Sequence, residues 1–255
     1  MTVELLPPHI DTQIAAAVRE FWRSRESGSG AQQGGRGHVV GGKNMDPFVD
    51  VLLAVTRHVG LPDHSVCTDT ASVSLPGYYR PAKRWDVVVV HEHRLLAAVE
   101  MKSQVGSFGN NINNRTEEAI GTAEDFRTAL RNGLYDGTRF KAPPLLTGEP
   151  APRPLSPAPF TGYVLLLEDC NDTSRPVPAE SRYYELDPDL ARASYAQRYQ
   201  LFCERAMHQE LYRAAALILS PRQGGSGEGE HRSLSEATSV RRFCAMLAGH
   251  LSAVT

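Results

Sequence analysis

The sequence is poor in cysteine and in long apolar runs, and each shortage excludes a class of protein. Its four cysteines lie far apart and form no C-x-x-C pair, which argues against a zinc ribbon or a disulfide framework and fits reduced thiols in a cytoplasmic protein. Apolar runs such as Val87–Val90 and Val164–Leu167 are far shorter than the roughly 18 residues that cross a bilayer. The first residues also lack the pattern of a secretory signal. We therefore expect a cytoplasmic protein without membrane partners.

An excess of positive charge is missing as well. The 255 residues carry 27 Lys and Arg against 29 Asp and Glu, a formal net charge of −2, so composition alone does not indicate a nucleic-acid binder, in which basic residues usually predominate. Only four of the 27 cations are lysines: Lys43, Lys83, Lys102 and Lys141. Codon bias in a GC-rich genome explains this shortage, and it makes the location of each lysine informative.

Periodicity predicts an α/β fold, because helices alternate with buried apolar strands. Helical spacing of apolar residues predicts helices over about 9–26, 46–55, 116–131, 194–219 and 236–251. Strands are predicted for a short segment at 72–75 and for RWDVVVV, RLLAAVEMKSQV and GYVLLLED. We expect a single domain with its core at about 44–170, a helical C-terminal part at about 190–255, and flexible loops at about 27–43 and 141–159.

The sharpest chemical feature lies on two neighbouring predicted strands. Asp86 lies on the first, and Glu100, Met101 and Lys102 follow one another on the second. Because side chains alternate along a strand, Glu100, Lys102 and Gln104 project from one face and Met101 from the other. An acid, a base and an amide in a row on one side of an apolar strand are unusual.

The register of this hairpin decides whether the two carboxylates meet. A three-residue tip, Glu92-His93-Arg94, would place Asp86 opposite Glu100 on one side of the sheet. A four-residue tip would place Asp86 opposite Val99, so that the carboxylates would lie on different faces. A metal site at this point therefore requires an odd-numbered tip or a β-bulge.

Paired carboxylates at this position suit Mg²⁺, which keeps much of its hydration shell and so needs few protein ligands. The ion would lower the pKa of a bound water and offset charge on a phosphorus. Lys102 would orient that water or help to deprotonate it. A solvated ion pair on an edge strand is the simpler alternative for Glu-x-Lys, which is a weak motif by itself. Asp86 and Gln104 shift the interpretation towards a nuclease.

Two further acids, Asp46 and Asp50, lie one turn apart at the start of the second predicted helix. They either add an acid near the metal or favour the positive end of the helix dipole, and we prefer the dipole explanation.

The order of these elements resembles the PD-(D/E)xK nuclease core, with Trp85 in place of the usual proline before Asp86. The stretch 74–121 also resembles the XhoI family of type II restriction endonucleases, as do GGKNMDPF at 41–48 and LEDC at 167–170. The resemblance implies a restriction-endonuclease-like core, in which helices flank a central mixed β-sheet, with added C-terminal helices.

The activity that the resemblance implies is Mg²⁺-dependent cleavage of both strands of double-stranded DNA by a homodimer, paired in function with a cognate DNA methyltransferase. The family's site is CTCGAG, cut after the first C to leave a four-base 5′ overhang. Carried over residue by residue, Asp86 and Glu100 become metal ligands and Lys102 the catalytic lysine. Two alternatives stay open: a structure- or modification-directed nuclease of the same fold, and a non-catalytic DNA-binding protein.

Candidate DNA contacts surround the predicted site. Asn pairs with adenine and Arg with guanine through two hydrogen bonds in the major groove, and the Gly- and Asn-rich loop after the catalytic strand would carry such residues to DNA. Asn and Gly also simply form turns, and the Gly-rich segment around Lys43 is equally well a plain flexible loop. The candidates are Lys43, Asn44, Gln104, Asn110, Asn111, Asn113, Asn114 and Arg115.

Overall fold

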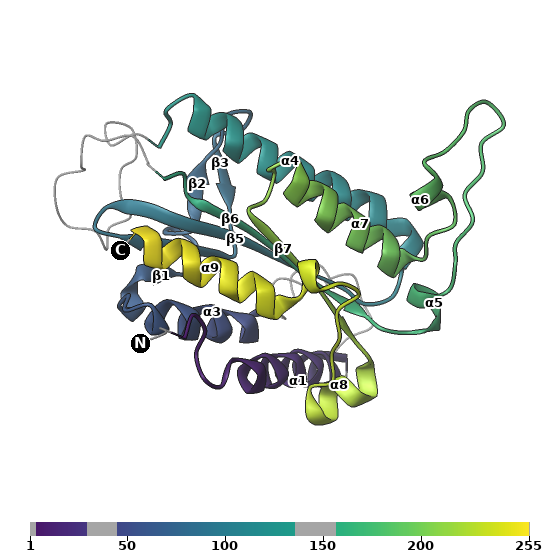
Figure 1. Ribbon diagram of the computed structural model, residues 1–255, viewed down its shortest axis with the longest axis horizontal. Helices are drawn as coiled ribbons and strands as arrows, with labels where there is room; N and C mark the ends of the chain where they lie inside the picture. Colours follow the sequence, from purple (N-terminus) through teal and green to yellow (C-terminus); the bar gives the residue numbers. More distant parts are fainter. Residues whose placement is uncertain (1–3, 30–44, 136–156, 255) are drawn as a thin grey trace.

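A computed structural model describes residues 4–29, 45–135 and 157–254 (Figure 1). Most of the expected loops at 27–43 and 141–159 lie outside these ranges, as do Lys43 and Asn44. The first three residues of the former, 27–29, are described and belong to the helix that ends at Ser29. Among the helices of the described ranges, none combines the length and apolar character that spanning a bilayer requires.

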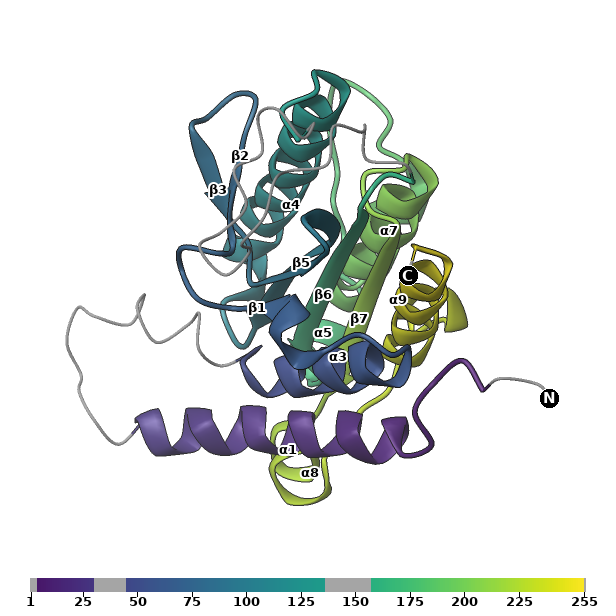
Figure 2. The ribbon, with the colours of Figure 1, turned by 90° about the vertical axis from the view of Figure 1, so that its left-hand side faces the viewer.

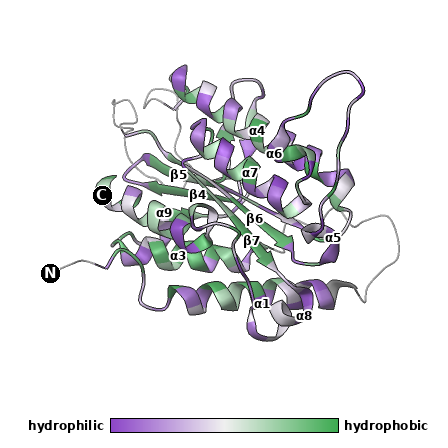
Figure 3. Cartoon of the chain, turned by 45° about the vertical axis from the view of Figure 1, so that its right-hand side comes forward, coloured by the Kyte–Doolittle hydropathy of each residue, from purple (hydrophilic) through white to green (hydrophobic). Residues whose placement is uncertain are grey.

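The central sheet is mixed, as expected, and holds five strands in the order β1-β4-β5-β6-β7. Strands β1, β4 and β5 are antiparallel neighbours, whereas β5, β6 and β7 run parallel. Parallel strands are usually covered on both faces and so read as continuous apolar runs, and Figure 3 shows β6 and β7 in this way. The strands are β1 (Val66–Cys67), β4 (Val87–His91), β5 (Arg94–Gln104), β6 (Phe160–Glu168) and β7 (Ala214–Ser220).

Helices cover both faces of this sheet (Figures 1 and 2). On one face lie α1 (Ile10–Ser29), α3 (Pro47–His58) and α9 (Val240–Val254), which share a buried apolar core with the strands. On the other face, α4 (Phe108–Arg131) and α7 (Tyr195–His208) pack against β6 and β7. The short elements are η2 (Asp63–Ser65), α5 (Asn171–Ser174), α6 (Pro188–Ala191), α8 (Arg222–Glu228) and η3 (Glu236–Thr238).

A separate two-stranded hairpin stands beside the sheet. Its strands, β2 (Ser74–Pro76) and β3 (Ala82–Arg84), pair antiparallel just before β4. Leu75 and Trp85 are buried with Phe126 of α4 in a third apolar cluster. The hairpin is therefore fixed to α4 on one side and joined directly to β4 on the other.

The helix expected over 194–219 is wrong in its second half. Helix α7 ends at His208, Glu210 takes a left-handed backbone angle (φ 55°), and Ala214–Ser220 forms β7, which is buried at every residue. Alanine and leucine favour helices by intrinsic propensity, but this run has no polar side, which a surface helix would need. The C-terminal part of the chain, expected to be helical over about 190–255, thus contributes a strand to the central sheet.

The loop expected before residue 116 is also wrong. Helix α4 begins at Phe108, because Phe108 and Ile112 lie one turn apart and are both buried. The chain turns earlier, at Gly106 and Ser107, which both have positive φ. The asparagines at 110–114 therefore lie on the first turns of a helix, and only some of them face the same way.

Candidate active site

The turn between β4 and β5 is shorter than the odd-numbered tip that we considered. His91 pairs with Arg94, so the turn consists of Glu92 and His93 alone. Both have positive φ, at 46° and 62°, which is the geometry of a two-residue type I′ turn. An uninterrupted ladder from this even-numbered turn would separate the two carboxylates.

A β-bulge restores the register. The pairing shifts between Val89 and Val90, and beyond it Val87 lies opposite Val99. The N–H of Asp86 donates to the carbonyl of Val99 at 3.2 Å, and continuing this register brings Asp86 beside Glu100. The bulge alternative of the sequence analysis is confirmed, and the three-residue tip is wrong.

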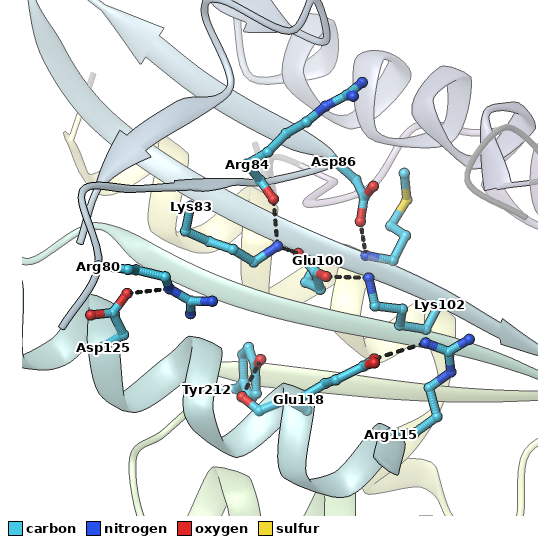
Figure 4. Close-up of polar contacts among 12 residues, drawn as sticks. Arg80, Lys83, Arg84, Asp86, Glu100, Lys102, Arg115, Glu118, Asp125 and Tyr212 are labelled. Atoms are coloured by element: carbon cyan, nitrogen blue, oxygen red, sulfur yellow. Dashed lines mark hydrogen bonds and ion pairs between the residues drawn. The ribbon is translucent and has the colours of Figure 1, made fainter. Parts of the chain in front are cut away.

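Glu100 is buried between two lysines (Figure 4). It is 3% exposed, and its Oε2 accepts a hydrogen bond from Nζ of Lys83 at 2.8 Å. Its Oε1 pairs with Nζ of Lys102. A carboxylate removed from water needs such partners because isolated burial of a charge is very costly. Both oxygens of Glu100 are therefore compensated by positive charge.

Asp86 and Lys102 influence each other's ionisation. Burial, together with the charge of Glu100, raises the pKa of Asp86 against the opposing effects of Lys102 and of the Met101 N–H, which donates to Oδ2 of Asp86 at 2.7 Å. Burial lowers the pKa of Lys102, but Glu100 and Asp86 outweigh it and raise the pKa overall. Lys102 is therefore an ammonium group that donates hydrogen bonds in this state.

These side chains line a cleft of about 1040 Å³. Asp46 and Asp50 of α3 line it too, and so does Glu20 of α1, which the sequence analysis did not single out. The side chain of Asp46 makes no capping hydrogen bond to the described residues of α3. Across the described ranges, no three His, Cys, Asp or Glu side chains gather closely enough to hold a metal ion. The carboxylates placed together on the sheet are thus Asp86 and Glu100.

Two of the expected DNA contacts are engaged within the protein. Gln104 is buried, and its Nε2 donates to the carbonyl of Gly106. Asn111 donates from Nδ2 to the carbonyl of Ser107 at 3.0 Å. These side chains stabilise the turn that leads from β5 into α4.

The other candidates on α4 are more accessible. Asn110, Asn113 and Asn114 are exposed, but Asn113 lines an apolar groove beside α7 rather than the catalytic cleft. Arg115 pairs with Glu118 at 2.8 Å and its charge opposes the raised pKa of Lys102. Arg115 is therefore an α4 residue whose charge acts on Lys102 (Figure 4).

Lys83 is the functional residue that our reading of motifs missed. It lies on β3, outside the Asp86 and Glu100 strands, and reaches Glu100 across the cleft wall, with its Nζ also 5.8 Å from the Trp85 ring centroid. The scarcity of lysine was the signal that could have found it, since two of only four lysines in the chain meet at one carboxylate.

Comparisons with known proteins identify the relatives of this chain. A family described as restriction endonuclease XhoI matches residues 23–145 and 151–232. The type II restriction enzyme BstVI of Geobacillus stearothermophilus is 38% identical over 230 residues, which cover 88% of this chain and 94% of that protein. The type II restriction enzyme XhoI of Xanthomonas vasicola is 43% identical over 202 residues, 76% of this chain and 74% of that one. No solved structure matches the chain.

Proposed function

The chain belongs to the XhoI family of restriction endonucleases, and from that premise we propose that Asp86, Glu100 and Lys102 form the site at which it hydrolyses DNA. The enzyme is a type II restriction endonuclease, a site-specific deoxyribonuclease. The observation that carries the site assignment is Glu100, buried between two lysines in an open cleft. A structural ion pair needs one cation, whereas phosphodiester hydrolysis needs positive charge gathered near the phosphate.

Asp86 and Glu100 are the residues that would hold the divalent metal ion, which we take to be Mg²⁺. Two carboxylates fit this ion because it keeps several of its waters and takes the remaining ligands from substrate phosphate. When bound, Mg²⁺ supplies an activated water and offsets negative charge on the phosphate. Each oxygen of Glu100 accepts from one lysine, and because a carboxylate offers about four lone-pair sites, Glu100 could ligate the ion with both ammonium groups still beside it.

Lys102 is the catalytic lysine in this proposal. As an ammonium group it donates hydrogen bonds to the attacking water and to a phosphate oxygen, which orients the first and neutralises the second. Lys83 approaches Glu100 from the β2–β3 hairpin and adds a second positive charge on the opposite side of the carboxylate.

Recognition follows from the same premise. We propose that the enzyme cuts CTCGAG after the first C, as a homodimer whose two-fold symmetry matches that of the palindrome, and that a cognate methyltransferase protects host DNA. Asn110, Asn114 and Arg115 are the strongest candidates for base contacts on α4. Gln104 and Asn111 stabilise the turn before this helix, and Asn113 faces the groove beside α7. Lys43 and Asn44 are proposed as further DNA contacts.

Digestion of unmodified lambda DNA with and without Mg²⁺, followed by sequencing of the ends, tests the proposal. We expect discrete fragments that begin with 5′-TCGA, formed only with the metal. Discrete fragments with other ends would keep the chemistry and overturn the specificity. Heterogeneous ends would favour a structure-directed nuclease, and an absence of cleavage would favour a modification requirement or a non-catalytic DNA-binding protein.

A further inference from the structure

The tip of the β2–β3 hairpin, residues 77–81, is tied to α4 by a buried carboxylate. Asp125 is 3% exposed and accepts hydrogen bonds from the N–H groups of Tyr78 and Tyr79 at 2.8 and 2.7 Å. It also pairs with Nε of Arg80 at 2.7 Å. A Cβ on Gly77 would lie only 2.6 Å from Oδ2 of Asp125, so the close approach requires glycine. The tip is therefore a fixed loop.

This fixed loop presents two aromatic rings to solvent. Tyr78 is 48% and Tyr79 70% exposed, and their ring centroids lie 5.0 Å apart at an interplanar angle of 83°. Such an edge-to-face pair supports both rings in one arrangement. Large exposed aromatic groups on an ordered loop are typical of a binding surface, because their apolar area gains free energy when a partner covers it.

The hairpin also links the tyrosine pair to the catalytic cleft. Lys83 and Arg84, on β3 of the same hairpin, line the cleft with Asp86 and Glu100. Figure 2 shows the hairpin at the upper left of the sheet and α1 along the bottom, so the cleft-lining strands lie between them. Arg84 is exposed at the edge of the cleft, and the guanidinium of Arg80, although paired with Asp125, is still 40% exposed beside the tyrosines. A polyanion complements this combination of cations and tyrosines.

We propose that the tip at 77–81 contacts the sugar–phosphate backbone of the DNA duplex beside the scissile bond, through Tyr78 and Tyr79. Backbone contacts of this kind position a protein on DNA without reading sequence. A loop that is already ordered loses little conformational entropy on binding, so more of the contact energy is retained. This inference rests on the proposed function, since it takes the cleft as the place where DNA is cut.

A second pair of tyrosines in the same chain provides a matched control for the tip. Tyr183 and Tyr184 are also adjacent and exposed, at 92% and 68%, but the segment that carries them, between α5 and α6, supplies no residue to the cleft lining, whereas the hairpin that carries Tyr78 and Tyr79 supplies two. We would measure fluorescence anisotropy with labelled duplexes, with Ca²⁺ in place of Mg²⁺ to prevent cleavage. One duplex would carry the cleavage site identified by end sequencing, and the other would lack it.

The Tyr78→Ala/Tyr79→Ala variant should bind both duplexes about tenfold more weakly, because each ring supplies one contact. The ratio of its affinities for the two duplexes should equal that of wild type. Tyr183→Ala/Tyr184→Ala should stay within about twofold of wild type. Equal affinity of the tip variant and wild type would overturn the inference. So would a loss confined to the specific duplex, which would indicate base reading, or an equal loss in both double variants.

A structural readout separates lost contacts from lost folding. Because both rings are exposed, the melting temperature of the tip variant should match that of wild type. If it falls, Tyr79→Ala alone repeats the test at the more exposed ring, with several-fold weaker binding expected. Wild-type protein that binds neither duplex would contradict the proposed function, whereas wild-type binding matched by the variants contradicts only the tip contact.

Discussion

The two halves of the central sheet obey different rules. Along β6 and β7, residues such as Leu165, Leu166 and Leu217 are fully buried, and the helices of both layers cover the strands. Along β5 the pattern breaks: Val99 and Met101 join the core on one face, whereas Glu100 and Lys102 project from the other and, together with Met101, line the cleft. The core of the β6–β7 half is apolar, whereas the β4–β5 half places the charged side chains of Glu100 and Lys102 in a strand that is otherwise largely buried and apolar.

The contrast explains why one half was easier to interpret than the other. An interrupted alternation of side chains identifies both the strand and its exceptional residues, because only a strand puts Glu100 and Lys102 on one face. A continuous apolar run such as Ala214–Leu219 carries no periodicity, so a strand and a buried helix look alike. Substitutions in each half should therefore affect different properties.

The largest effect is expected at the catalytic end. Lys102→Ala should slow single-turnover DNA cleavage by about 1000-fold, because it removes the ammonium group that orients the water and neutralises the phosphate. DNA affinity should change little. A quenched-flow assay and a binding titration check the two parts, and cleavage within about tenfold of wild type would show that the site is misassigned.

The buried half should respond in stability instead. Leu217→Ala removes a fully buried side chain of β7 and should lower the free energy of unfolding by about 2–5 kcal/mol, as measured by urea denaturation. The folded fraction should cleave DNA at the wild-type rate. Ile120→Ala, at a position that is 42% exposed, is the control and should cost less than about 1 kcal/mol. Similar costs for both would contradict the contrast between buried and exposed positions.

A smaller effect is expected at Arg115, in the N-terminal half of α4. Arg115→Ala should weaken specific binding by about 1–3 kcal/mol if Arg115 pairs with a guanine, with relaxed preference at one base pair. Arg131→Ala, in the last turn of α4, is the matched control. Cleavage rates on singly substituted sites distinguish the possibilities, since uniform weakening on all sequences would make Arg115 a phosphate contact.

The smallest effect is expected in the pH dependence of stability, because burial of an ionised carboxylate lowers the free energy of unfolding. Since burial raises the pKa of Asp86, the folded state binds its proton more tightly than the unfolded state does, and stability falls as pH rises through this range. Metal-free Asp86→Asn should therefore be more stable than wild type at neutral pH. The difference should shrink on acidification and vanish below the unfolded-state value of 3.8. Denaturation at several pH values checks this.

Asp125 provides a control of opposite sign. Burial opposes its ionisation, but the N–H groups of Tyr79 and Tyr78 and the Arg80 guanidinium outweigh it and lower the pKa. Its ionised form therefore contributes stability above its unfolded pKa, and that contribution is lost as pH falls through the folded value. Asp125→Asn should be less stable than wild type at neutral pH. If both variants shift stability in the same direction, the two carboxylates are not energetically distinct.

Sequence reasoning named the three side chains that the structure brings together at the candidate site, but not its full geometry. The sequence predicted that Asp86 must pair with Glu100 if the two are to hold a metal ion, because only that register places both carboxylates on one face. Whether an odd-numbered tip or a bulge produces the register depends on tertiary packing. Lys83 precedes Glu100 by 17 residues and reaches it only because the β2–β3 hairpin folds back. Such long-range contacts leave no local pattern.

The prediction of a loop at the asparagine-rich segment was wrong for a different reason. Asn and Gly favour turns, but Phe108 and Ile112 extend α4 through this segment because their burial outweighs local propensity. The fold class was predictable because the alternation of helices and strands does not depend on element boundaries.

The β-bulge at Val89 and Val90 has a consequence for how this family can change over time. In this hairpin the bulge leaves one residue unpaired between the two-residue turn and the active site. An insertion in the turn at Glu92 and His93 can be absorbed by loss of the bulge, which leaves Asp86 opposite Glu100. The outer end of the hairpin is thus free to vary in length while its inner end keeps the catalytic alignment.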